Sequence, residues 1–403
     1  MSLPAMLRQG VVRELLTALP GARVVGGAVR DHLAGRPIHD IDVGSAFPPE
    51  EATTRLRQAG FRIFETGLDH GTVTAVRHGT SVEVTTLRRD VEADGRHASV
   101  AWTRNWREDA ERRDFTINAM SMDAHGNLFD YFQGQADLRV GRVRFIADAA
   151  TRIREDYLRS LRFFRFWARY GRGAPDAEAM AAIAGHLDGL RILSVERVWM
   201  EFKRLLEAPD PCDALEHMQA SGVWPTLLAE AAPVDTRLLR ELIRRQAPRD
   251  ALLRFAALLP PGAPAHAIAS RLKFSGDEAA RLKLLRRRDI PPPASAVDKR
   301  GMRLFLLAVA RNGHDPQPDA EAWLWLREAE GLSPPDIREA LGQVAVPVFP
   351  LQGRDLLALG YAAGPEMGRT LQQLRAWWVA EGAEAGREAC LLRLAELAKP
   401  GHA

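Results

Sequence analysis

Cysteine is scarce in this chain of 403 residues, with only Cys212 and Cys390. Two cysteines provide neither a disulfide framework nor a cysteine zinc site. The sequence also lacks an uninterrupted run of about 18 apolar residues, the minimum for a membrane-spanning helix. Residues 1–21 scatter charges among their apolar positions, which is not typical of a signal peptide. We therefore expect a protein of the reducing cytoplasm with no membrane segment.

Lysine is also rare, because only five of the 55 basic residues are lysines and the rest are arginines. The 52 acidic residues leave a net charge of only +3, and 46% of the chain is hydrophobic. That apolar fraction excludes a mainly disordered chain, and the length predicts two to four domains. The charge is unevenly placed: residues 139–172 hold ten arginines and three acids. Such a stretch beside aromatic residues is typical of a binder of phosphate-rich ligands, with a solvated helix face as the alternative.

No repeat of fixed period and no cluster of histidine metal ligands is found. Residues 1 to about 145 mix the two kinds of pattern. Helices are predicted over 6–18, 27–35 and 49–58, strands over 23–25, 40–43, 61–64, 71–77 and 81–87, and a mobile loop over 90–105. From about residue 149 the pattern is helical, with breaks at prolines. We expect an α+β head, a small mixed sheet with helices, followed by an elongated all-α neck, body and tail, divided as 1–145, 146–210 and 211–403.

Asp40 and Asp42 are the first candidates for chemistry. Residues i and i+2 of a strand point to the same face, so the two carboxylates are expected to converge while Ile41 turns into the core. Two neighbouring carboxylates attract a divalent cation, and oxygen ligands completed by substrate phosphates suit Mg²⁺. An Asp-x-Asp pair is also common on protein surfaces and in glycosyltransferases that use sugar nucleotides.

Two glycines, Gly26 and Gly27, join a predicted strand to a predicted helix. This arrangement presents backbone N–H groups to a phosphate, with Arg30 one turn into the helix. The spacing fits neither a dinucleotide-binding G-x-G-x-x-G nor a P-loop, so a dehydrogenase and a P-loop ATPase lose support. In a further cluster, RRDFTINA, Arg113, Asp114 and Asn118 are expected to contact a phosphate and a ribose; a helix-start cap is the alternative.

Residues 155–166, EDYLRSLRFFRF, are predicted to form a helix with one apolar face. Asp156 and Arg159 lie one turn apart on an adjoining face, and a local ion pair is the simple interpretation. As a fixed acceptor–donor pair they would match adenine and cytosine and leave guanine or uracil with unpaired groups, at about 1–3 kcal/mol each. Arg162 and Arg165 continue this stripe toward a triphosphate.

Taken together, these segments resemble the class II nucleotidyltransferases of the polymerase-β-like superfamily, the tRNA CCA-adding enzymes and bacterial poly(A) polymerases. GGAVRD…HDID resembles the catalytic motif of that family, and RRDFTINA its ribose-contacting motif. Asp130…Gly134…Asp137-Leu138 resembles the segment that links its domains. EDYLRSLRFFRF resembles the motif that selects the nucleobase, and residues 194–201 the helix-stabilising motif that follows.

The resemblance implies roles for individual residues. Asp40 and Asp42 would be catalytic and bind Mg²⁺, which orients the triphosphate and activates the RNA 3′-hydroxyl. The nucleotide-binding residues would be Gly27, Arg30, Arg113, Asp156, Arg159, Arg162 and Arg165. Glu83 would be a third carboxylate near the metal, or else part of an ordinary polar strand face. Residues 90–105 resemble the mobile loop that helps switch from C to A addition.

Within the family, residues 66–74 resemble the CCA-adding form, because the arginine-rich motif of poly(A) polymerases is missing there. The expected reaction is transfer of CMP and AMP from CTP and ATP to the 3′ end of tRNA, with release of pyrophosphate. A poly(A) polymerase, a CC-only enzyme and an A-only enzyme stay open. A glycosyltransferase leaves residues 155–166 unexplained, and a catalytically inactive RNA-binding protein leaves the intact Asp-x-Asp unexplained. The sequence does not determine the oligomeric state.

Overall fold

The computed structural model describes residues 10–67, 71–93, 98–311 and 313–397, together with Pro4 and Leu7. The chain forms two compact units, Met1–Val234 and Asp235–Ala403. The domain boundaries expected at 145 and 210 therefore both fall inside the first unit. One reason is that α11 (Cys212–Ala220) packs against α8 (Leu158–Tyr170), where the rings of His217 and Trp167 meet edge to face at 4.9 Å.

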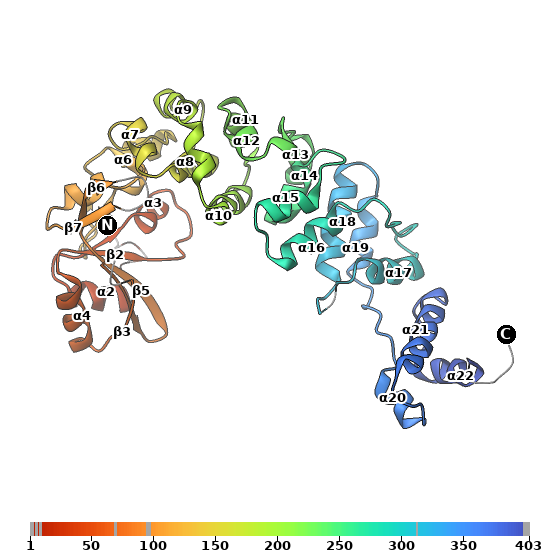
Figure 1. The fold of residues 1–403 in the computed structure, drawn as a ribbon. Helices are drawn as coiled ribbons and strands as arrows, with labels where there is room; N and C mark the ends of the chain where they lie inside the picture. Colours follow the sequence, from red (N-terminus) through yellow and green to blue (C-terminus); the bar gives the residue numbers. More distant parts are fainter. Residues whose placement is uncertain are drawn as a thin grey trace. The chain divides into compact units, whose positions relative to one another are not determined.

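The first unit contains a mixed sheet, as the sequence predicts (Figure 1). It has seven strands, of which β8 and β9 were not predicted. The strand order is β3-β4-β5-β2-β1-β8-β9, with β2 and β5 parallel and the other neighbours antiparallel. The bounds in that order are Arg62–Gly67, Thr72–Arg77, Thr80–Thr86, Asp42–Ser45, Arg23–Val25, Ser121–Met122 and Leu128–Phe129. Val24, Val43, Val73 and Val84 are buried and form the inner face of the sheet. Residues 68–70, within the segment that favours the CCA-adding form, lie outside the described residues.

The prediction of a loop over residues 90–105 is wrong for the strand residues that the structure describes there. A two-stranded hairpin forms there from β6 (Arg88–Ala93) and β7 (Ala98–Trp102), with Arg88 opposite Trp102; residues 94–97 lie outside the description. Four of the six residues of β6 are charged, and backbone pairing forms a strand whatever its side chains are, so the composition of β6 gave no sign of it.

The helices of the first unit precede or connect the strands as far as α5, and those from α6 onward follow β9 and form a helical region. Their bounds are α2 Gly10–Ala18, α3 Gly27–Leu33, α4 Pro49–Gln58, α5 Trp106–Glu111, α6 Gly134–Val140, α7 Ala149–Glu155, α8 Leu158–Tyr170, α9 Ala177–Ala184, α10 Val195–Leu206, α11 Cys212–Ala220 and α12 Val223–Leu227, with 3₁₀ turns η2 Thr116–Asn118, η3 Leu187–Ile192 and η4 Ala229–Ala231. The helix predicted over 155–166 is in fact interrupted, because α7 ends at Glu155 and α8 begins at Leu158. Phe115, Phe145 and Phe163 form an aromatic core that fixes α8 to the head.

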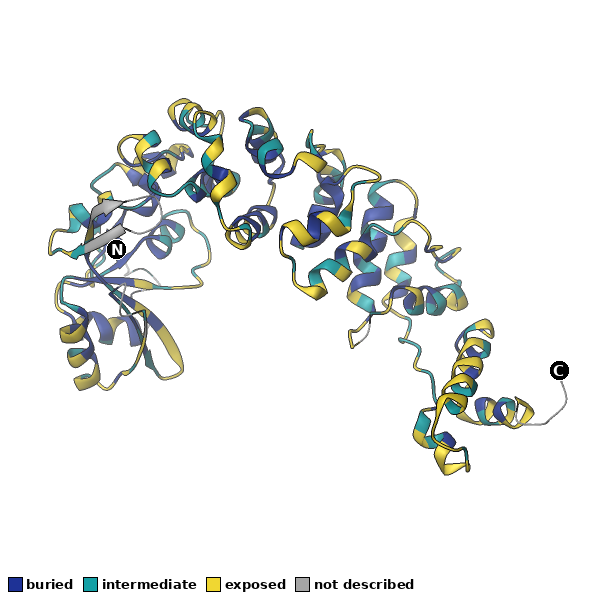
Figure 2. Ribbon diagram, in the orientation of Figure 1, coloured by how far each residue is buried: buried dark blue, intermediate teal, exposed yellow. Residues whose placement is uncertain are grey.

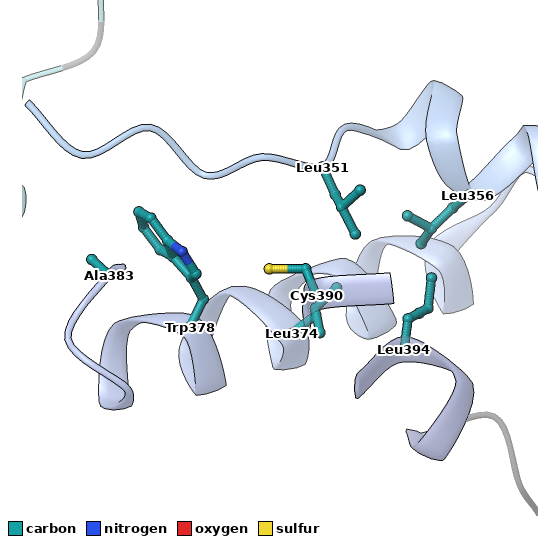
Figure 3. Close-up of a cluster of buried hydrophobic side chains, with 7 residues drawn as sticks. All are labelled: Leu351, Leu356, Leu374, Trp378, Ala383, Cys390 and Leu394. Atoms are coloured by element: carbon teal, nitrogen blue, oxygen red, sulfur yellow. The ribbon is translucent and has the colours of Figure 1, made fainter. Parts of the chain in front are cut away.

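The second unit is entirely helical in the part that the structure describes, which confirms the expected all-α body (Figure 2 shows its buried faces). Its helices are α13 Arg237–Arg244, α14 Ala251–Leu258, α15 Ala265–Arg271, α16 Gly276–Leu285, α17 Lys299–Val309, α18 Gln317–Ala329, α19 Pro335–Leu341, α20 Gly353–Ala358, α21 Pro365–Ala380 and α22 Arg387–Leu397. The last three share a small core in which Trp378 and Leu374 of α21 face Leu356 and Cys390 (Figure 3). Over the described residues, no helix is both long enough and apolar enough to cross a membrane.

Candidate functional site

A cavity of about 520 Å³ opens in the first unit where the end of β1, the start of α3, the segment after α5 and the start of α8 meet. Its lining is strongly basic, with seven arginines against two aspartates, Asp114 and Asp156. The arginines are Arg30, Arg88, Arg112, Arg113, Arg159, Arg162 and Arg197. Most of the residues that the sequence predicts to bind a nucleotide are therefore brought together here.

Gly26 and Gly27 form one wall of this cavity. Gly26 has φ 64°, a left-handed conformation that favours glycine, and its N–H donates to the carbonyl of Met120 at 3.0 Å. A Cβ atom on Gly26 would lie 2.8 Å from Nη1 of Arg113. Glycine is thus required for the turn and for the approach of Arg113, and Gly27 starts α3 beside it.

Arg30 lines the same cavity but is already tied into the protein. Its guanidinium donates to Oδ1 of Asn118 at 2.6 Å and to the two carboxylate oxygens of Asp31 at 3.1 and 3.0 Å. It also lies over the rings of Phe166 and Tyr170, 5.1 and 4.6 Å from their centroids. Direct contact of Arg30 with a phosphate stays a prediction.

Asp109, which the sequence analysis did not single out, anchors the arginines on another side of the cavity. Its buried carboxylate accepts from Nε of Arg112 at 2.9 Å, from Nη2 of Arg113 at 3.2 Å and from the backbone N–H of Arg88 at 3.3 Å. Burial favours a higher pKa for Asp109, but the charges of Arg113 and Arg112 outweigh it and hold the pKa below its usual value. The i, i+3 and i, i+4 spacing to these arginines was the available signal.

Asp114 and Arg162 connect the segment after α5 to α8. Oδ2 of Asp114 accepts from Nε of Arg162 at 2.7 Å, and Oδ1 accepts from Nδ2 of Asn118 and the N–H of Phe115, both at 2.9 Å. Burial works to raise the pKa of Asp114, but Arg162 and the hydrogen bonds hold that pKa below its ordinary value. Asp114 is therefore a buried anion that fixes Arg162 at the cavity.

Asp156 and Arg159 both reach the cavity, but they do not form the local ion pair considered above. Asp156 lies between α7 and α8, where Oδ1 accepts from the N–H of Leu158 at 3.1 Å and Oδ2 accepts from Nη2 of Arg197 at 2.8 Å. Arg159 is instead paired with Glu155, and it donates to the carbonyl oxygens of Arg152 and Arg112 at 3.0 and 3.3 Å. The break between the helices separates the two partners.

Arg165 lies outside the lining of this cavity. Its Nε is 2.7 Å from Oε2 of Glu201, a buried residue of α10. Burial lowers the pKa of Arg165 to about 10, against the attraction of Glu201. Contact of Arg165 with a triphosphate therefore stays a prediction, and in this structure the side chain joins α8 to α10.

The three candidate metal ligands lie at the edge of the central strands. β2 begins at Asp42, so Asp40 lies in the preceding coil and not on the strand, and Ile41 is half-buried where a core position was expected. Asp42 lies directly opposite Glu83 of the parallel neighbour β5, so both carboxylates project from the same face. Asp40, Asp42 and Glu83 are exposed. Although Asp42 has contact with solvent, the protein around it partly desolvates its carboxyl. This desolvation first, then the charge of Glu83 and to a smaller extent that of Asp40, raise the pKa of Asp42 against the effect of Arg113.

Such a set of mutually repelling carboxylates fits a divalent cation, because a cation removes the repulsion. Within the described residues, no group of three or more His, Cys, Asp or Glu side chains is arranged as a metal site. Binding of a metal by these side chains stays a prediction. The pairing of β2 and β5 sets the positions of Asp42 and Glu83, and Asp40 lies in the coil before β2.

Comparison with known proteins identifies the family to which the chain is similar. Residues 22–144 match the model of the poly(A) polymerase head domain, and residues 174–234 match that of a probable RNA and SrmB binding site of polymerase A. The mitochondrial CCA tRNA nucleotidyltransferase 1 of Danio rerio is 36% identical over 380 residues, covering 88% of this chain and 83% of that protein. The Homo sapiens protein of the same name is 34% identical, with 92% and 85% covered.

Among solved structures, the CCA-adding enzyme of Bacillus stearothermophilus in complex with CTP is similar over 98% of both chains, with a TM-score of 0.74 and 28% identity. The chain belongs to the family of class II CCA-adding enzymes and poly(A) polymerases.

Proposed function

We propose that this protein adds CCA to the 3′ end of tRNA, moving CMP and AMP from CTP and ATP to the RNA 3′-hydroxyl and releasing pyrophosphate. The observation that carries the proposal is the fixed carboxylate of Asp156, held by Arg197 beside Arg159 in a cavity lined by arginines. The relatives described above, which are named as CCA-adding enzymes, support the same reaction.

Asp156 and Arg159 are suited to select the nucleobase. The bonds to Leu158 and Arg197 use one lone pair on each carboxylate oxygen of Asp156, and each oxygen has a second. The bonds of Arg159 use three of the five N–H groups of its guanidinium. Acceptor and donor capacity therefore remains on both side chains, and an acceptor beside a donor matches adenine and cytosine. Guanine or uracil would leave polar groups unpaired, at a cost of about 1–3 kcal/mol each.

The arginines of the cavity are suited to hold the triphosphate. Asp109 and Asp114 fix Arg112, Arg113 and Arg162 in place before any ligand arrives. A preorganised cation loses little side-chain freedom on binding and needs no rearrangement when charge develops on the phosphates. Since the lining carries far more positive than negative charge, a nucleoside triphosphate is the ligand that its electrostatics favour.

Asp40 and Asp42, with Glu83 nearby, are the residues that would hold Mg²⁺. When bound, Mg²⁺ would lower the pKa of the attacking hydroxyl and neutralise charge on the phosphates. The chain itself keeps Asp42 next to the glycine wall, because Asp42 pairs with Val25, the last residue of β1. Asp42 is thus beside Val25, the residue before Gly26 of the cavity wall, on the side where the phosphates would be held.

A poly(A) polymerase, a CC-only enzyme and an A-only enzyme are the alternatives, since all would use the same base-selecting residues. We favour full CCA addition because residues 66–74 lack the arginine-rich motif of poly(A) polymerases. We also propose a reducing compartment, the cytoplasm, in which the buried thiols of Cys212 and Cys390 remain unpaired; the animal relatives named above are mitochondrial by name.

The test is incorporation of labelled CTP and ATP, separately and together, into tRNA transcripts that lack CCA, CA or only A, with Mg²⁺. Two cytidines followed by one adenosine and then a stop are expected. Long adenosine tracts on arbitrary RNA would identify a poly(A) polymerase instead. A product that ends after CC, or that gains only the final A, would identify a partial enzyme, and no incorporation would refute the proposal.

A further inference from the structure

A second basic cavity, of about 510 Å³, lies in the first unit and shares no lining residue with the first. It is formed by the end of α3, the helix α6 and the end of α8, elements labelled in Figure 1. Four arginines line it, Arg36, Arg139, Arg169 and Arg172, and no acidic residue does. The last three belong to the arginine-rich stretch of residues 139–172, so this part of the stretch has no role in the nucleotide cavity.

The backbone of two of these arginines, Arg36 and Arg172, is positioned by the ends of two helices. After α3, Gly35 adopts φ 65°, and the N–H of Arg36 donates to the carbonyl of Asp31 at 2.8 Å. After α6, Gly141 adopts φ 76°, and its carbonyl accepts from the N–H of Arg172 at 2.9 Å. Left-handed glycines that end helices in this way fix the direction of the chain that follows. The backbone beneath Arg36 and Arg172 is therefore fixed by the fold, on two sides of this cavity.

The arginines of the two cavities differ in their partners. In the first cavity, Arg30, Arg112, Arg113, Arg159, Arg162 and Arg197 are each paired with a carboxylate. In the second, none of the four has an ion-pair partner among the described residues, and the guanidinium of Arg36 donates only to the carbonyl of Arg169, at 2.5 Å. Like charges gathered in one cavity repel one another, and a bound anion would relieve that repulsion.

The lining of this cavity is suited to bind a negatively charged group and has few side chains that could distinguish one nucleobase from another. Besides the arginines, its side chains with polar groups are Gln135 and Tyr170, and the hydroxyl of Tyr170 donates to Asp31. Guanidinium groups bind phosphate oxygens in pairs, and such contacts carry no sequence information. Phosphate is therefore the chemistry that this cavity fits.

We propose that this second cavity binds phosphates of the RNA chain, as a sequence-independent contact separate from the nucleotide cavity. The choice of RNA rests on the proposed function, because an enzyme that extends many tRNAs needs contacts that are independent of sequence. Free polyphosphate has the same chemistry and is the other source of such groups. Tyr170 borders both regions, since its ring contacts the guanidinium of Arg36 at 4.9 Å and that of Arg30 at 4.6 Å.

The test is direct binding of tRNA lacking CCA, measured over a range of salt concentrations without nucleotide. The test variant carries Arg139→Gln and Arg169→Gln, two exposed positions. The control carries Arg13→Gln and Arg62→Gln, which are exposed arginines of the same unit outside both cavities and remove the same charge. We expect the test variant to bind about tenfold more weakly and its salt slope to fall by about 1.5, the loss of two phosphate contacts. The control should bind like the unaltered protein.

A second arm titrates inorganic tripolyphosphate into each protein, with CTP saturating the first cavity. Loss of tripolyphosphate binding in the test variant, with RNA binding equal to that of the control, would keep the phosphate cavity but assign it to a free polyphosphate. Equal binding of both probes by test variant and control would overturn the proposal. Because neither arm requires catalysis, a protein that adds no nucleotide would refute the proposed function without deciding this test.

Discussion

Nη2 of Arg197, on α10, donates a hydrogen bond of 2.8 Å to Oδ2 of Asp156, which lies 41 residues earlier between α7 and α8. Asp156 belongs to the candidate base-selecting pair, and this bond fixes its carboxylate through a residue of α10, a helix outside residues 155–166. It also explains why Asp156 can face the cavity while Arg159 pairs with Glu155. The geometry of base selection thus depends on the packing of α10 against α8.

Replacing Arg197→Gln should loosen Asp156 without removing it. This pair is exposed to solvent, where an ion pair contributes about 0.2–1 kcal/mol, so we expect kcat/KM for CTP and ATP to fall by roughly 2- to 5-fold. Misincorporation of UTP and GTP should rise relative to CTP and ATP, because the acceptor is no longer fixed. Steady-state kinetics with each nucleotide measures both effects. Arg204→Gln, an exposed position on the same helix, is the matched control, and equal kinetics for the two variants would contradict the role of Arg197.

Replacing Asp42→Ala should abolish nucleotide transfer, with a fall in kcat of at least about 10³-fold, because it removes a proposed Mg²⁺ ligand. Chelation of divalent cations should do the same to the unaltered protein, and added Mg²⁺ should restore transfer. The measurement is incorporation of labelled CTP into tRNA lacking CCA. Glu50→Gln, an exposed carboxylate of α4, should leave the rate unchanged. Full activity in the chelated enzyme would exclude the metal.

Replacing Asp114→Asn should destabilise the fold and change its response to acid. The folded pKa of Asp114 is held below the ordinary value of about 3.9, so its stabilising effect is complete above that pH and is lost as the pH falls through the folded pKa. At pH 7 we expect a loss of about 3 kcal/mol, since Arg162 loses its buried partner. Urea unfolding of both proteins between pH 7 and pH 3 should show this difference shrinking as the pH falls. Asp188→Asn, at a fully exposed site, should match the unaltered protein throughout.

Replacing Gly134→Ala should destabilise the first unit. A Cβ atom there would lie 2.2 Å from the carbonyl oxygen of Thr116, and a backbone atom cannot yield as a flexible side chain can. We expect a loss of about 2–3 kcal/mol in the free energy of unfolding, measured by urea denaturation. Gly276→Ala, in α16 with open space around it, should cost nothing or stabilise slightly. Equal stability of the two variants would show that α6 can move away from Thr116.

Much of this molecule could be predicted from the sequence because its signals are local. The alternating strand patterns, the proline breaks between helices and the glycine pair after β1 depend on near neighbours, so the α+β head and the helical body could be predicted. The sequence motifs resemble those of the family and occur in the same order, and they predicted that the residues now seen in the first cavity would lie together. The hairpin of β6 and β7 was missed because β6 is mostly charged and its pairing with β7 is made through the backbone, which leaves no alternating pattern along β6.

What only the tertiary structure decided is which charge pairs with which. The sequence by itself determined that arginines dominate residues 139–172 and that acids lie among them. It did not determine that Asp156 pairs with Arg197 or that Asp109 anchors Arg112 and Arg113. Nor did it determine that the four arginines of the second cavity have no ion-pair partner among the described residues. An ion pair depends on distances of a few ångströms, and distances between residues tens of positions apart are set by how helices pack.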